Sequence, residues 1–213
     1  MEEPFDHLVF SKNVVEFVTV AKEFCAYLEN APQYPKKEFI GVSLKMLPLL
    51  YLKVVVLPRP EAELEDGYVE QAVDEDLYRQ IFEGIRMKMG GHNDYLEVFL
   101  PDMQTSEEPL TASVAEDLTD MYQDLKNFVT AYKSGVTEFM NDALLEAIDQ
   151  FEIYWGQRLV NTLRALHSAY YSGDDLSDEE KKEPRESERN TQDWIISKKQ
   201  REWQDENDDL KSI

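Results

Sequence analysis

The clearest structural signal in the sequence is residues 113–171, SVAEDLTDMYQDLKNFVTAYKSGVTEFMNDALLEAIDQFEIYWGQRLVNTLRALHSAYY. Both halves repeat apolar side chains every three or four residues, which is the spacing of the buried face of a helix. These side chains are Val114, Leu118, Met121, Leu125, Phe128 and Tyr132, then Leu144, Ile148, Phe151, Trp155, Leu159 and Leu166. Gly135 separates the halves, so we predict two antiparallel helices joined by a short turn, the second over residues 137–171.

Three more helices are predicted before this hairpin. Helical spacing covers residues 11–29, 35–57 and 74–89, with a kink expected at Pro48 and a stop at Gly90-Gly91. The predicted fold class is therefore all-α: a single bundle of about five main helices with a long antiparallel helix hairpin, plus a short C-terminal tail helix.

Local signals mark one helix start and two places where a strand is conceivable. Ser113 and Glu116 have the spacing of a capping box. Residues 54–56 are three valines, but no alternating segment exists to pair with them, so helix is preferred there. Residues 95–100 could hold a short extended segment.

The chain divides into a body and a tail by composition. Residues 1–172 carry the helical periodicity and form the predicted helical bundle domain. Residues 173–190 are acidic and almost free of apolar side chains, as in a flexible linker, and residues 191–213 form an amphipathic tail segment. Trp194 and Trp203 in this tail are candidate contacts to the body or to a partner.

The net charge of the chain limits the kinds of partner that it can bind. The chain has 44 acidic and 22 basic residues, a formal charge of −22, which disfavours direct binding to nucleic acid and favours a basic protein partner. The single cysteine permits no intramolecular disulfide, the acidic N-terminus is unlike a signal peptide, and no apolar run reaches the roughly 20 residues of a membrane span. We therefore expect a cytoplasmic protein that makes no membrane contact.

Four carboxylates suggest a metal site. Asp117 with Asp120, and Glu146 with Asp149, repeat an acid-x-x-acid spacing across the predicted hairpin, and Glu152 would lie level with Asp117. Such pairs resemble the acidic motifs with which all-helical nucleotide pyrophosphatases hold magnesium. The candidate ligands are Asp117, Asp120, Asp149 and Glu152, but acid pairs three residues apart recur by chance in so acidic a chain, and a solvated acidic face is the preferred interpretation.

A polar stripe on the last predicted helix is the second candidate site. It consists of Gln157, Arg158, Asn161, Arg164, His167 and Ser168. This local basic patch could bind an anionic ligand, a partner or the acidic tail of the chain itself. The competing interpretation is an ordinary exposed face, or arginines paired internally with the surplus carboxylates.

No established catalytic pattern appears. The three histidines are far apart and form no zinc-binding or Glu-x-x-His motif, and Cys25 lies in an apolar stripe. The sequence contains no GxSxG, phosphate-loop or dinucleotide motif, so no cofactor is predicted apart from magnesium in the hydrolase alternative.

Three segments resemble a known family. Residues 11–29 (SKNVVEFVTVAKEFCAYLE), 122–129 (YQDLKNFV) and 154–167 (YWGQRLVNTLRALH) resemble the uncharacterised bacterial domain-of-unknown-function family 5063. The resemblance implies a helical protein of about 200 residues and carries no activity, cofactor or catalytic residue.

These observations leave three hypotheses. The preferred one is a non-catalytic acidic protein-interaction or adaptor module, because the surface is charged and catalytic motifs are missing. The alternative is a magnesium-dependent all-α hydrolase that uses the carboxylates named above. A DNA mimic, which would need carboxylates spaced like phosphates over one face, ranks third.

Overall fold

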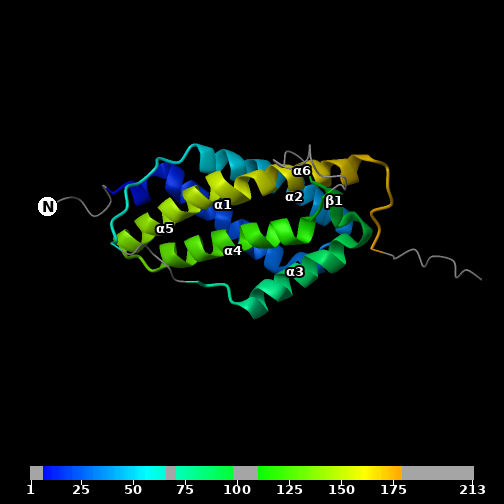
Figure 1. The fold of residues 1–213 in the computed structure, drawn as a ribbon, viewed down its shortest axis with the longest axis horizontal. Helices are drawn as coiled ribbons and strands as arrows, with labels where there is room; N and C mark the ends of the chain where they lie inside the picture. The colour runs from blue at the N-terminus through cyan, green and yellow to red at the C-terminus, as the bar shows by residue number, and fades with distance from the viewer. Residues whose placement is uncertain (1–6, 66–70, 98–109, 179–213) are drawn as a thin grey trace, which may run out of the picture. The chain divides into compact units, whose positions relative to one another are not determined.

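The computed structural model describes residues 7–65, 71–97 and 110–178, which form a helical bundle with one small sheet (Figure 1). The α-helices are α1 (Lys12–Glu29), α2 (Lys36–Val55), α3 (Glu75–Met89), α4 (Val114–Lys133), α5 (Thr137–Gln150) and α6 (Gly156–Tyr171). Three short 3-10 helices, η1 (Leu8–Phe10), η2 (Ala31–Gln33) and η3 (Gly90–His92), join them, and the π-helical turn η4 (Phe151–Trp155) links α5 to α6. The all-α prediction is confirmed.

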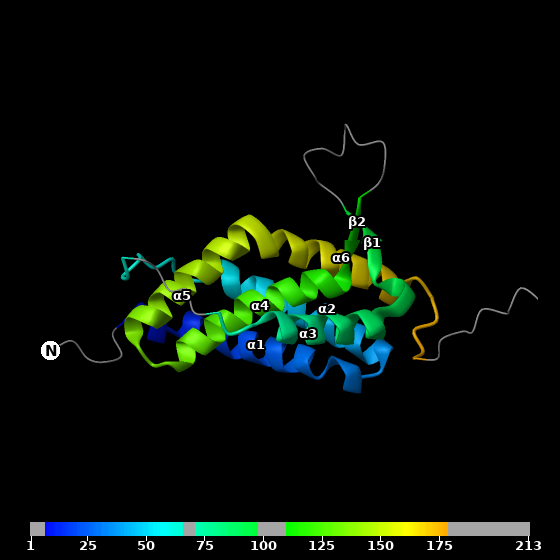
Figure 2. The same cartoon turned by 60° about the horizontal axis from the view of Figure 1, so that its bottom comes forward.

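Helix α4 lies at the centre of the bundle. It packs against α1, α3, α5 and α6, and Figure 2 shows it between these helices. A helix with several neighbours must be apolar around much of its circumference, and α4 buries residues on more than one face. Its buried apolar residues are Val114, Ala115, Leu118, Met121, Tyr122, Leu125, Phe128, Val129 and Ala131. Two polar residues of α4, Asp117 and Thr119, are buried as well and need partners.

The first two helices follow the predicted boundaries closely. Pro35 immediately precedes α2, and the backbone N–H of Lys36 donates to Asp178 Oδ1 at 3.0 Å. Pro48 lies inside α2 on its exposed side, and Val54 and Val55 are helical, so the strand alternative is wrong there.

Helix α3 and the small sheet come next along the chain. Asp74 accepts a hydrogen bond from the Leu77 N–H at 2.8 Å, and Gly90, with φ of +53°, ends the helix where the sequence predicts a stop. Strand β1 (Asp94–Leu96) then pairs antiparallel with β2 (Thr111–Ser113), so the extended segment that the sequence allowed is present.

The predicted helix hairpin is confirmed, with one correction. Ser113 Oγ accepts from the Glu116 N–H, and Gly135 takes the left-handed φ of +72° in the turn before α5. The predicted regular helix over residues 137–171 is wrong at η4, where the Gly156 N–H bonds the Phe151 carbonyl five residues back. The extra residue of this π-turn rotates everything after it relative to α5.

Polar and apolar contacts hold the segments at the edges of the bundle. Asp142 on α5 accepts from the backbone N–H groups of Glu63 and Leu64 at 2.8 and 2.9 Å. Leu176 is 7% exposed, so the first residues assigned to the linker pack with the helices. The predicted tail, including Trp194 and Trp203, lies outside the described residues.

Among the helices of the described ranges, none combines the length and the apolar character that a bilayer crossing requires.

Candidate functional site

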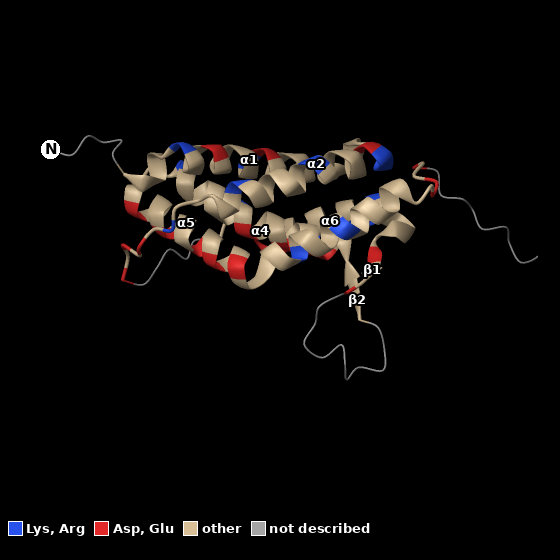
Figure 3. Ribbon diagram, turned by 90° about the horizontal axis from the view of Figure 1, so that it is seen from above, with Lys and Arg blue, Asp and Glu red and all other residues tan. Residues whose placement is uncertain are grey.

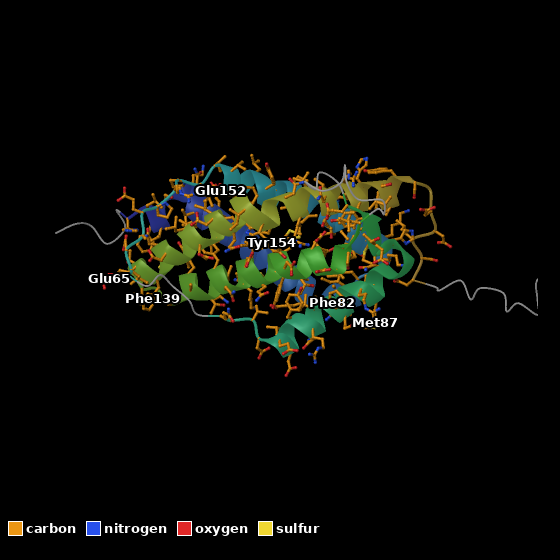
Figure 4. The ribbon with its side chains drawn as sticks, in the orientation of Figure 1. Glu65, Phe82, Met87, Phe139, Glu152 and Tyr154 are labelled. Carbon is orange, nitrogen blue, oxygen red and sulfur yellow. The ribbon has the colours of Figure 1, made fainter. Side chains whose placement is uncertain are left out.

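A cluster of polar side chains lies between α3, α4, β1 and the η4–α6 segment. We call it the polar cluster; it comprises Tyr78, Tyr95, Asp117, Asp120, Tyr154, Arg158 and Thr162. Tyr154, which Figure 4 labels, belongs to the π-turn. The π-turn and the first turns of α6 thus bring Tyr154, Arg158 and Thr162 to the carboxylates of α4.

Asp117 is the buried centre of the polar cluster. It is 0% exposed, and its two oxygens accept hydrogen bonds from Arg158 Nη1 at 2.7 Å, from Thr162 Oγ1 at 2.9 Å and from the Tyr95 hydroxyl. A carboxylate in such a place needs compensation, because an unpaired buried charge costs several kcal/mol.

Asp120, one turn later on α4, is held in a similar way. The hydroxyls of Tyr78 and Tyr154 donate to it at 2.7 and 2.6 Å, and Arg158 Nε lies 3.8 Å from its second oxygen. The Arg158 guanidinium also stacks 4.5 Å from the Tyr154 ring centroid. A single arginine therefore bridges both carboxylates and joins α6 to α4.

The electrostatics of this cluster follow from its burial. Burial raises the pKa of Asp117 above its usual value, and the hydrogen bonds from Tyr95, Arg158 and Thr162 oppose that shift. Burial opposes charge on Arg158 too, but the hydrogen bond to Asp117, together with the electrostatic effects of Tyr154, Asp117 and Asp120, outweighs it and raises the pKa of the guanidinium. Burial followed by the hydrogen bond to Asp117 raises the pKa of the Tyr95 hydroxyl, so this group remains a donor at neutral pH.

Asp124 lies one turn beyond Asp120 on α4 and has a different environment. Burial, with the negative charges of Asp120 and Glu146, raises its pKa to about 7. This carboxyl group therefore titrates near neutral pH, well above the range of an ordinary aspartate.

The four carboxylates of the magnesium hypothesis do not converge. Asp117 and Asp120 face Arg158, whereas Asp149 and Glu152 bind Arg59, with Glu152 3.0 Å from the guanidinium. Within residues 7–65, 71–97 and 110–178, no group of three histidine, cysteine or acidic side chains is placed to hold a metal ion. A divalent cation would have to displace arginine from each pair.

The structure divides the predicted polar stripe of α6. Arg158 and Asn161 turn inward: Asn161, 3% exposed, donates to Glu97, which follows β1, and accepts from Gln157 Nε2 at 3.1 Å. The internal pairing considered from the sequence is thus realised for Arg158. The His167 ring packs 4.7 Å from the Tyr171 ring, while Arg164 and Ser168 line a surface groove beside β1.

Sequence reasoning missed the three tyrosines and the threonine of the polar cluster. Tyr154 and Arg158 are four residues apart on one helix, a spacing that could have suggested their contact. Tyr78 and Tyr95 bond carboxylates 42 and 22 residues away, and no local pattern encodes such pairs.

An exposed apolar face lies on the second half of α2, the helix that packs against α6. We call it the α2 face; it comprises Leu49, Leu52, Val55 and Val56. Leu52 is 54% exposed and Val55 50% exposed. Tyr51 of α2 contacts Phe151 of η4, and their ring centroids are 5.3 Å apart.

The charges at the rim of the α2 face are already paired. Lys53 Nζ lies 2.6 Å from Glu16, and Arg59 bonds Glu152 at 3.0 Å. In Figure 3, acidic and basic residues are interspersed along the helices and are not gathered into one acidic side.

Comparison with known proteins gives a family and a related structure. A family model described as Domain of unknown function (DUF5063) matches residues 8–172. The crystal structure of protein BF1032 from Bacteroides fragilis is similar, with a TM-score of 0.70 and 40% sequence identity, and the match covers 79% of this chain and 98% of that one. No curated protein matches the chain.

Proposed function

The chain belongs to the family described as Domain of unknown function (DUF5063), which assigns no activity, and we propose from its surface that it is a non-catalytic protein-interaction module. The observation that carries this proposal is the α2 face. Four apolar side chains stand exposed along the second half of α2, in a chain with a formal charge of −22, where solubility favours polar groups.

The α2 face suits a protein partner with an apolar surface of its own. Covering a half-exposed leucine contributes on the order of 1 kcal/mol, so the few side chains of this face supply a useful part of a binding free energy. The carboxylates of Glu16 and Glu152 at the rim already have cationic partners, so docking would not leave them buried without a counterion.

The charge of the whole chain favours a basic partner. An excess of negative charge attracts a positively charged protein over long range and accelerates its encounter. We place this partner in the cytoplasm, since the single cysteine, Cys25, is buried, and burial raises the pKa of its thiol to about 12. An isolated, protonated thiol of this kind fits a fold that has no need of oxidation.

The alternatives receive less support. The hydrolase hypothesis needs converging carboxylates, and those of Asp117, Asp120, Asp149 and Glu152 are engaged by two different arginines. A DNA mimic needs an unbroken acidic face, and Figure 3 shows mixed charges instead.

A site-specific photocrosslinker tests the module. We expect a crosslinker at Leu52 to capture one partner in cells, and the same group at Met87, which is 72% exposed on α3, to capture none. Isothermal titration with the purified partner should then show Leu52→Asp weakening binding at least tenfold and Met87→Asp leaving it unchanged.

Three outcomes would overturn the proposal. Equal capture at Leu52 and Met87, or no capture at either, would mean that the α2 face does not bind a partner protein. A crosslink between two copies of this chain would assign the face to self-association.

A further inference from the structure

The outer edge of β1 is open to pairing. In an antiparallel pair, alternate residues direct both backbone groups toward the neighbouring strand. The bonds Val114 N–H to Asn93 O and Glu97 N–H to Leu110 O, both 2.8 Å, fix this alternation. The backbone groups of Asp94 and Leu96 therefore point away from β2, and no strand within the described residues pairs with them.

This edge faces α6 across a groove. Arg164 Nη2 donates to Leu96 O at 3.0 Å, which places the guanidinium of α6 at the outer edge of β1. The groove has a volume of about 410 Å³, within the range of ligand sites. Its α6 wall consists of the small residues Ala165, Ser168, Ala169 and Ser172, which leave room beside the strand.

The two ends of the groove carry opposite charges. Arg164 occupies the end beside Leu96. Asp94 at the start of β1 and Asp174 after α6 line the groove toward its other end, away from Arg164. Asp174 lies 3.8 Å from His92 Nε2. From Arg164 to Ser172, eight residues of helix rise about 12 Å, the span of roughly four residues of extended chain.

We propose that this groove binds an extended peptide segment of a partner protein, which adds a third strand to the outer edge of β1. The segment has a basic side chain at the end of the groove formed by Asp94 and Asp174, and an acidic group at Arg164. Backbone hydrogen bonds to Asp94 and Leu96 supply the affinity, and the two charged ends set the register. Pairing requires Arg164 to release Leu96 O, and the acidic group of the peptide offers its guanidinium a replacement.

The groove uses other residues than the α2 face, so its occupation is independent of the function proposed above. A chain with both surfaces would have the two binding sites that an adaptor needs.

Two charged pentapeptides test the proposal. Acetylated and amidated Lys-Val-Thr-Val-Glu and Glu-Val-Thr-Val-Lys place opposite charges at the two ends for either strand direction. The first measurement is the shift of backbone amide signals of the full-length, ¹⁵N-labelled protein on titration with each peptide. We expect one of them to shift the Asp94 and Leu96 amides with a Kd below 1 mM.

Peptide variants separate pairing from adventitious contact. N-methylation of alternate amides on the strand side, or replacement of the lysine by glutamate, should weaken binding at least fivefold. Equal binding by these variants would overturn the proposal, and so would no binding by either parent peptide at 1 mM.

Protein variants locate the bound peptide. Leu96→Pro removes the outward N–H without touching the ladder to β2 and should weaken binding at least fivefold, whereas Leu96→Ala keeps the N–H and the affinity. Ser168→Trp fills the groove and should abolish binding, whereas Val160→Trp, at an exposed position of α6 that does not line the groove, should not. Retained binding in Leu96→Pro and Ser168→Trp would place the peptide elsewhere.

Discussion

At the scale of single residues, stability depends on how buried charges find partners. Asp117 is fully buried in the middle of the bundle and is compensated by donors from β1 and α6. Only Arg158 among these donors carries a charge, and it serves Asp120 as well. Removing the arginine would leave one carboxylate buried without its counterion, which is usually more costly than never having had the pair.

We therefore expect Arg158→Ala to lower the free energy of unfolding by about 3 kcal/mol. Arg158→Lys should recover part of the loss, because an ammonium group restores the charge but cannot reach both carboxylates with a planar fork. Urea unfolding followed by circular dichroism measures the effect, with Arg164→Ala, an exposed arginine of the same helix, as the control. A loss below about 1 kcal/mol for Arg158→Ala would mean that Asp117 is protonated in the folded protein and does not require its counterion.

The raised pKa of Asp124 leads us to expect that the free energy of unfolding depends on pH. Its pKa is raised from 3.8 to about 7 on folding, so the folded protein binds the proton more tightly than the unfolded chain. Stability from this group is therefore greatest below about pH 4 and falls as pH rises to about 7, beyond which it is constant. Asp124→Asn removes the titration and should be more stable than the parent by about 1–2 kcal/mol at pH 8, with the advantage vanishing near pH 4.

The difference between parent and variant, followed by urea unfolding from pH 4 to 8, isolates this group from all others. Asp76→Asn, at a side chain that is 95% exposed on α3, is measured alongside as the surface control. An advantage for Asp124→Asn that did not change with pH would refute the titration.

At the scale of secondary structure, η4 decides how the long helix presents its side chains. Gly156 is required there, since a Cβ at this position would lie 2.5 Å from the Phe151 carbonyl oxygen and 2.9 Å from the Phe151 ring. The π-turn directs Trp155 into the core at 0% exposure and Tyr154 and Arg158 toward α4. A regular helix would rotate one of these sets away from its partners.

Gly156→Ala should accordingly destabilise the protein by about 2 kcal/mol or more through overpacking. Gly91→Ala is the matched control, because a Cβ there meets no atom within 4 Å. Thermal unfolding of the two variants makes the comparison, and near-ultraviolet circular dichroism reports whether Trp155 is displaced. Equal stability of both variants would show that the π-turn relaxes at little cost.

At the scale of the whole molecule, several acidic side chains at the junctions between elements form ion pairs with basic side chains. Arg59, Arg158 and Lys126 each join elements that are far apart in the sequence. The surfaces proposed for binding are the exposed apolar side chains of the α2 face and the strand edge in the groove beside β1. Their separation on different elements allows each to be tested without disturbing the other.

The sequence by itself determined the helices, their order and the central hairpin, because periodicity, caps and glycine stops act over only a few residues of chain. It also showed the acidity, and hence which partners electrostatics favours. The π-turn could not be predicted from the sequence. Gly156 looks like any glycine within a helix, and only the structure shows that the Phe151 carbonyl packs against it.

Only the tertiary structure decided what the polar residues do. The spacing of Asp117 and Asp120 is equally compatible with a metal site and with an ion pair. Which of the two forms depends on the side chain of α6 that lies opposite them. The packing of α4 against α6 and the rotation that η4 introduces determine which side chain that is. A buried carboxylate takes the partner that the fold brings within hydrogen-bonding distance, and for Asp117 that partner is Arg158.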